Sequence, residues 1–140
     1  MINFFYESVA TNINELSTVS WLNKVAVSEK KSIGEISLIL CLDDYLLDIN
    51  QKYLNHDTYT DIISFDNTMG NKLAGDIFIS VDRVKENAEI YEVDFEEELR
   101  RVMVHGLLHF CGYKDKTEED KSVMRQKENE KLKMFHVEHL

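Results

Sequence analysis

The residues best suited to chemistry in this 140-residue chain are two histidines four positions apart, His105 and His109. Four residues of an α-helix correspond to ~400° of rotation, which brings both imidazoles to one face about a turn apart. Two imidazoles at this spacing can bind one tetrahedral metal ion. The spacing therefore predicts a divalent metal site on a helix, with zinc as the expected ion.

A third ligand is expected just beyond this helix. Gly112 is a typical helix terminator, because glycine adopts the left-handed conformation that ends many helices. The chain can then turn back and bring Asp115 close to the histidines. Two histidines and one carboxylate leave a fourth position for water, which is typical of a catalytic zinc site.

The residue after the first histidine is Gly106, where a typical zinc protease has a glutamate that acts as general base. Peptide hydrolysis by that mechanism is therefore disfavoured. Glycine within a helix costs ~1 kcal/mol relative to alanine. Its presence here indicates that another backbone or a substrate approaches the helix closely.

Several residues have a simpler interpretation. Either histidine of the pair could be a hydrogen-bonded core group instead of a ligand. Cys41 and Cys111 have apolar neighbours and are interpreted as reduced, packed thiols. His56 is expected to be an exposed loop residue without a role, and His136 and His139 are expected to lie outside the metal site, near the C-terminus.

The elements that must position these side chains follow from periodicity. Ser17 is the expected N-cap of the first helix, and Gly34 is expected to interrupt the chain before the second strand. Helices and strands alternate around a small sheet, so we expect a single α+β domain over residues 1–140. The predicted strands cover residues 2–6, 35–42, 61–66 and 73–81, and the predicted helices cover residues 17–31, 43–54, 82–92, 95–110 and 117–134.

Composition limits the possible functions. The net charge of −10 disfavours a protein that coats nucleic acid through general charge neutralisation. A nuclease with a local basic strip is still compatible with this charge. No apolar run approaches the ~20 residues needed to cross a bilayer. The N-terminal segment has no secretory signal, so we expect a cytoplasmic protein without a membrane partner.

Three blocks of the sequence form a pattern that is similar to a known family. The first is the histidine segment itself, and the others lie earlier in the chain. The blocks are His105–Tyr113, Asn50–Tyr53 with Thr60–Phe65, and Ala74–Ile77. Together they resemble the YbeY family, bacterial metal-dependent endoribonucleases that mature ribosomal RNA. The resemblance implies a mixed sheet of about four strands flanked by helices, with a zincin-like metal helix.

The resemblance also implies an activity and a set of site residues. The expected activity is single-strand-specific cleavage in maturation of the 16S ribosomal RNA 3′ end and in ribosome quality control. One zinc ion and partners from the small ribosomal subunit are implied with it. The expected ligands are His105, His109 and Asp115; the expected catalytic residues are His105, His109 and Lys52; and the expected RNA-binding residues are Lys52, Arg100 and Arg101.

The chain departs from the family pattern at three positions. Asp115 stands where the family usually has a third histidine, and a carboxylate oxygen is a harder ligand than imidazole. Another divalent ion, such as manganese, is therefore also possible. Leu54 stands where the family usually has an arginine thought to contact phosphate, and Tyr59 stands where proline is common.

Two other functions are compatible with these residues. One is a metal-dependent hydrolase of another substrate, including peptides. The other is a ribosome-assembly factor that binds RNA without cutting it and uses the metal structurally. Three smaller questions also stay open. Asp76 could support a histidine nitrogen or cap a turn, and Ser64 could line the cleft. Arg125 and the lysines of the charged run Glu118–Lys133 could touch RNA or lie on a solvated face.

Overall fold

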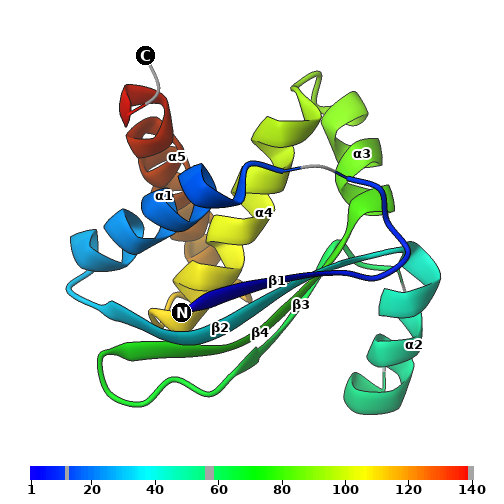
Figure 1. Ribbon diagram of the computed structural model, residues 1–140, viewed down its shortest axis with the longest axis horizontal. Coiled ribbons are helices and arrows are strands. Elements are labelled where there is room, and N and C mark those ends of the chain that lie inside the picture. Colours follow the sequence, from blue (N-terminus) through cyan, green and yellow to red (C-terminus); the bar gives the residue numbers. More distant parts are fainter. Residues whose placement is uncertain (12, 56–58, 139–140) are drawn as a thin grey trace.

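A mixed sheet of four strands, in the order β1-β2-β4-β3, forms the base of the molecule (Figure 1). The computed structural model describes residues 1–11, 13–55 and 59–138. The prediction of an α+β fold with about four strands is confirmed. The strands are β1 (Ile2–Tyr6), β2 (Ser32–Cys41), β3 (Ile62–Asp66) and β4 (Lys72–Ser80), and the helices are α1 (Glu15–Ser28), α2 (Asp43–Leu54), α3 (Val81–Ile90), α4 (Phe95–Phe110) and α5 (Glu118–Glu138).

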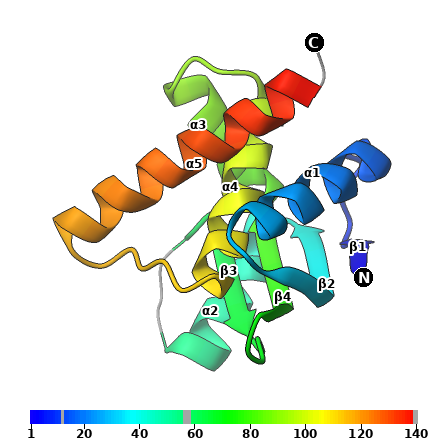
Figure 2. The ribbon, with the colours of Figure 1, turned by 90° about the vertical axis from the view of Figure 1, so that its left-hand side faces the viewer.

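The strand pairing places β3 at one edge of the sheet, beside α4. β1 pairs with β2 and β2 with β4 in parallel, whereas β3 runs antiparallel to β4. Figure 2 shows α5 crossing over α4, with α1 beside them and α2 on the other side of the sheet. The helix that carries the histidine pair is therefore held between the sheet and another helix.

Each face of the sheet has its own apolar core. The larger core lies under α1, α4 and α5 and includes Trp21, Leu38 and Leu108. The smaller one lies under α2 and is built around Leu46 and Ile63. Alternate residues of β2, β3 and β4 supply both cores, because successive side chains of a strand point to opposite faces.

Glycine lets α4 lie close to the sheet. A Cβ on Gly106 would lie 3.0–3.2 Å from side-chain atoms of Ile77 and Ile62, which is tighter than ordinary packing. The close approach expected at this glycine is present, but the expectation that another backbone or a substrate makes it is wrong. The groups that approach are side chains of the sheet rather than another backbone or a substrate.

Two expected boundaries near the N-terminus are wrong. Helix α1 begins at Glu15, and its N-cap is Asn14, whose side chain accepts a hydrogen bond from the Ser17 backbone N–H. Ser17 is therefore the third residue of the helix. Gly34 lies inside β2, which begins at Ser32. A glycine fits there because the Lys72 side chain packs where a Cβ would lie.

The charged helix α5 is longer than expected and is not a uniformly solvated face. Glu128 and Lys131 are 5% and 1% exposed. The Trp21 indole donates a hydrogen bond to the Lys131 carbonyl, 2.8 Å away, which fixes α5 against α1. Among the described residues, no helix is long and apolar enough to cross a membrane.

Candidate metal centre

The two histidines of α4 point their Nε2 atoms at one another, 3.0 Å apart. His105 Nδ1 lies 2.6 Å from the Glu128 carboxylate, and His109 Nδ1 lies 2.9 Å from the Tyr113 carbonyl oxygen. Each Nδ1–H donates to an oxygen, so each neutral ring keeps a lone pair on Nε2. Two acceptor nitrogens facing each other at this distance repel unless a proton or a metal ion lies between them.

Asp115 completes a group of three side chains that could hold a metal ion. Its carboxylate oxygen lies 3.5 Å from His105 Nε2. One ligand atom from each of the three residues falls within 4.8 Å of the others. Zinc–nitrogen bonds of ~2.0–2.1 Å in a tetrahedron place neighbouring ligands ~3.3 Å apart. The residues present therefore fit one divalent ion, and the core-histidine interpretation explains the geometry less well.

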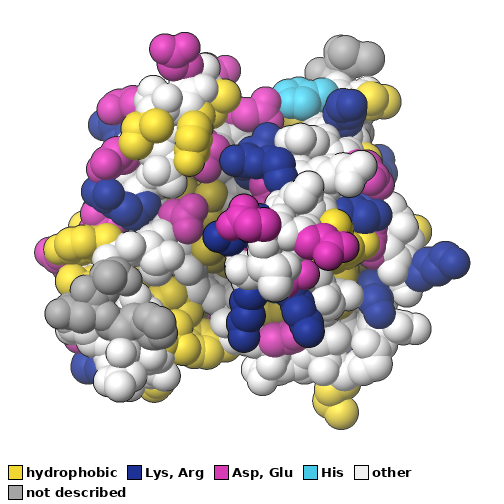
Figure 3. All heavy atoms as spheres, turned by 180° about the vertical axis from the view of Figure 1, so that it is seen from behind, with side chains coloured by type: hydrophobic (Ala, Val, Ile, Leu, Met, Phe, Trp, Pro, Cys, Tyr) yellow, Lys and Arg dark blue, Asp and Glu magenta, His cyan; other side chains and the backbone are white. Residues whose placement is uncertain are grey.

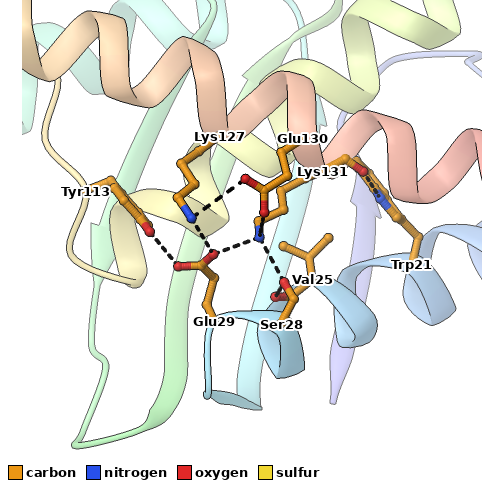
Figure 4. Close-up of polar contacts among 8 residues, drawn as sticks. All are labelled: Trp21, Val25, Ser28, Glu29, Tyr113, Lys127, Glu130 and Lys131. Atoms are coloured by element: carbon orange, nitrogen blue, oxygen red, sulfur yellow. Dashed lines mark hydrogen bonds and ion pairs between the residues drawn. The ribbon is translucent and has the colours of Figure 1, made fainter.

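A polar cluster fixes the loop that follows α4 and carries Asp115. The Tyr113 hydroxyl donates to Glu29 at 2.6 Å, and Lys127 and Lys131 lie 3.3 and 2.7 Å from the other oxygen of the same carboxylate. Figure 4 shows that these side chains come from α1, α5 and the loop and meet at Glu29. Because the Tyr113 carbonyl accepts the hydrogen bond from His109, the cluster also orients this ligand.

The surrounding charges shift the pKa values of the two histidines in opposite directions. Burial alone would lower the pKa of His105, but the hydrogen bond and charge of Glu128 outweigh it and hold that pKa above its usual value. Burial and the nearby charge of His105 lower the pKa of His109. Burial opposes ionisation of Glu128, yet its hydrogen bonds with His105 and Arg101 keep its pKa below the usual value. Glu128 is therefore a buried anion beside the metal ligands.

The candidate ligands His105, His109 and Asp115 line a cleft of about 550 Å³. Its walls come from the start of β3, from α3 and α4, and from one face of α5. Whether Ser64 lines the cleft was open from the sequence, and the structure places it among the lining residues. Asp61 and Glu98 also line the cleft, and burial raises the pKa of each carboxyl group.

The structure separates the cations that were expected to bind RNA. Arg101 lines the cleft and donates to Glu128 and Asn129 at 3.0 and 2.9 Å. Arg100 lies outside the lining, and its guanidinium stacks 4.1 Å from the centre of the Phe135 ring.

The third expected cation lies on another helix. Lys52 is exposed on α2, pairs with Asp48 at 3.0 Å and is not among the residues that line the cleft. The roles predicted for Lys52 and Arg100 stay predictions.

Glu128 is the site residue that the sequence reasoning missed. Asp76 was considered as the partner of a histidine nitrogen, but it lies on β4, paired with Phe65 of β3. Glu128 holds His105 instead. A signal was present in the sequence: Glu128 lies four residues after Met124 and four before Leu132, so it belongs to the buried stripe of α5.

The remaining candidates lie apart from the metal ligands. Cys111 is a packed thiol whose pKa burial raises to about 11. His136 lies 3.0 Å from Glu97, and the structure places neither of them in the cleft. His56 and His139 lie outside the described residues.

Comparisons with known proteins agree with this geometry. The family model described as Endoribonuclease YbeY matches residues 5–136. A protein named Endoribonuclease YbeY from Flavobacterium johnsoniae is 59% identical over 138 residues, covering 99% of both chains. Its namesake from Flavobacterium psychrophilum is 58% identical, covering 98% of both chains.

A solved structure supports the fold independently. The solution structure of TM1509 from Thermotoga maritima superimposes with a TM-score of 0.73 at 24% identity, covering 99% of this chain and 91% of that one. The sequence blocks, the histidine pair on α4 and the nearly full-length matches lead to one assignment. The chain belongs to the YbeY family.

Proposed function

We propose that this protein is a metal-dependent endoribonuclease that cleaves single-stranded ribosomal RNA, with maturation of the 16S 3′ end as its process. The observation that carries the proposal is the convergence of His105, His109 and Asp115 on one point in the wall of a cleft. The names of the relatives support cleavage of RNA. The proposal includes ribosomal RNA as the substrate, components of the small ribosomal subunit as partners and the cytoplasm as the location.

The three ligands suit hydrolysis better than a structural role. Three protein ligands leave an open coordination position, whereas structural zinc sites are closed by four. A divalent ion bound here would lower the pKa of water towards ~7 and polarise a phosphoryl oxygen. Zinc is the ion we propose, one per chain. The oxygen ligand from Asp115 also suits manganese.

The chain's own groups keep the ligands oriented. Glu128 fixes the ring of His105, and the Tyr113 carbonyl fixes the ring of His109. Both contacts hold the proton on Nδ1, so both Nε2 atoms are free to bind a cation. Such orienting partners typically contribute 10–100-fold to metal affinity.

The peptidase alternative has weaker support from the structure. A general-base glutamate would have to replace Gly106. This residue is buried against Ile77 and Ile62 of the sheet, so its position does not face the cleft. A ribosome-assembly factor without catalysis is the remaining alternative, and the open ligand set favours the enzyme over it.

One comparison tests the proposal. The wild type, His109→Ala and His136→Ala are assayed for metal content and for cleavage of a 16S ribosomal RNA 3′ precursor. We expect His109→Ala to lose metal and cleavage. His136→Ala is the matched control, because it removes a histidine that pairs with Glu97 away from the cleft. Full cleavage by His109→Ala, or a wild type that binds no metal, would refute the proposal.

A further inference from the structure

One face of α5 forms a wall of the cleft and carries two cations. Lys121, Met124, Arg125 and Glu128 all line the cleft. Their spacing of three, four and seven residues places them on one side of the helix. At 1.5 Å per residue, Arg125 lies ~4.5 Å along the axis from Glu128, and Lys121 lies ~6 Å further on.

These two cations have weak partners within the protein. Arg125 lies 3.8 Å from a Glu128 oxygen that already accepts a hydrogen bond from Arg101 at 3.0 Å. Lys121 lies 3.8 Å from Glu118, whose side chain is 96% exposed. An exposed ion pair such as Lys121–Glu118 contributes ~0–1 kcal/mol. The Arg125 side chain is 54% exposed, and its distance of 3.8 Å from Glu128 is too long for a hydrogen bond. Both cations are therefore available to an anionic ligand, whereas Arg101 is held by two good hydrogen bonds.

Other parts of the cleft disfavour phosphate. Two carboxyl groups line it, that of Asp61 just before β3 and that of Glu98 in α4. Figure 3 shows lysine and arginine side chains interspersed with acidic ones on the face seen from behind, so this face is not uniformly negative. A phosphodiester backbone that enters the cleft is attracted to the α5 wall and repelled by the carboxylates.

We propose that Lys121 and Arg125 form a phosphate-binding pair that holds the backbone of single-stranded RNA along α5, next to the metal centre. The inference rests on the proposed endoribonuclease function and names residues that position its substrate. Lysine and arginine bind phosphate through charge-assisted hydrogen bonds. The strand would then pass from this pair towards the ligands His105, His109 and Asp115.

Binding of a short, labelled single-stranded RNA tests the pair. The measurements use the full-length His109→Ala chain, which should bind without cutting, over a range of salt concentrations. We expect Lys121→Ala and Arg125→Gln each to weaken binding about tenfold, since a hydrogen bond to a charged group is worth roughly that factor. Each should also reduce the slope of log affinity against log salt by about 0.7.

Lys133→Ala is the matched control, because Lys133 is an exposed cation of the same helix that does not line the cleft. Its affinity and salt slope should match those of the His109→Ala parent. Arg125→Lys keeps the charge and should recover most of the affinity that Arg125→Gln loses. Circular dichroism and thermal unfolding show whether each variant is folded.

The outcomes separate this inference from the proposed function. Unchanged affinity in both Lys121→Ala and Arg125→Gln, equal weakening by Lys133→Ala, or no RNA binding by the parent would overturn the phosphate-binding pair. Cleavage by the wild type could still stand in the first two cases. If the pair variants lose binding but the wild type cuts no RNA, the pair is supported and the nuclease proposal fails.

Discussion

Replacing Glu128 with glutamine tests how far one buried carboxylate controls the metal centre. The residue is 5% exposed and contacts His105 at 2.6 Å and Arg101 at 3.0 Å. Glutamine keeps the shape and one acceptor oxygen but removes the charge. A hydrogen bond to a charged group contributes ~1.5–3 kcal/mol, so we expect the metal-free variant to lose about 2 kcal/mol of stability.

The stability difference should depend on pH in a defined way. The pKa of Glu128 is lowered from its ordinary 4.5, so its contribution is present above about 4.5 and is lost as the pH falls through the lowered value. The pKa of His105 is raised from 6.5, so its contribution is complete below about 6.5 and is lost as the pH rises through the raised value. The difference between wild type and variant should therefore be largest between these two pH values.

Metal binding should respond in two separable ways. At a pH where His105 is neutral in both proteins, the loss of its orienting partner should weaken metal affinity about 10–100-fold. A proton on His105 competes with the metal, so affinity also falls as the pH drops through the pKa of this residue. Removing the Glu128 charge lowers that pKa, and the midpoint of the pH dependence should move to lower pH.

Competition with a chromophoric chelator over a pH series measures both effects on metal binding. Urea unfolding of the metal-free protein over the same pH range measures the stability difference. Glu119→Gln is the control, since it removes the same charge from an exposed position of α5. A variant with wild-type affinity, or with a midpoint that stays in place or moves to higher pH, would refute the assigned role of Glu128.

Two further substitutions test the ligand set and the packing of the sheet. Asp115→Ala should weaken metal binding at least tenfold in the same chelator competition, and unchanged affinity would mean that the third ligand lies elsewhere. Gly75→Ala should lower the free energy of unfolding in urea by about 3–5 kcal/mol. The backbone φ is +151°, and a Cβ would clash with the Phe65 carbonyl and lie 2.7 Å from the Phe110 ring. Gly70→Ala is its control, because φ is +61° and an added Cβ would meet no atom within 4 Å. It should lower the free energy of unfolding by about 1–2 kcal/mol. An equal loss of stability in both variants would show that the close contacts at Gly75 do not matter.

The parts of the site that could be predicted are those that lie close together in the chain. His105, His109 and Asp115 fall within eleven residues, so helix geometry and one glycine turn are enough to bring them together. Helix α4 also has the predicted bounds, Phe95–Phe110, because its apolar stripe is regular and its first turn is acidic.

The parts that could not be predicted depend on packing between distant elements. Glu128 reaches His105 only because α5 crosses α4, and Glu29 reaches Tyr113 only because α1 packs beside α5. Local patterns classify these acids as surface residues. A polar residue on an apolar stripe, as at Glu128, was the one local sign that a buried partner exists.

Because of the cluster at Glu29, the segment that carries the candidate ligands depends on residues elsewhere in the fold. A synthetic peptide of residues 105–115 would contain all three ligands, yet it would lack Glu128 and the anchor that Glu29 provides for Tyr113. His105 would then have lost the partner that fixes its tautomer and direction, and the Tyr113 carbonyl that orients His109 would have lost its anchor. The segment cannot be grafted onto another scaffold as a short motif, and a successful transfer would have to include the contacts from α1 and α5.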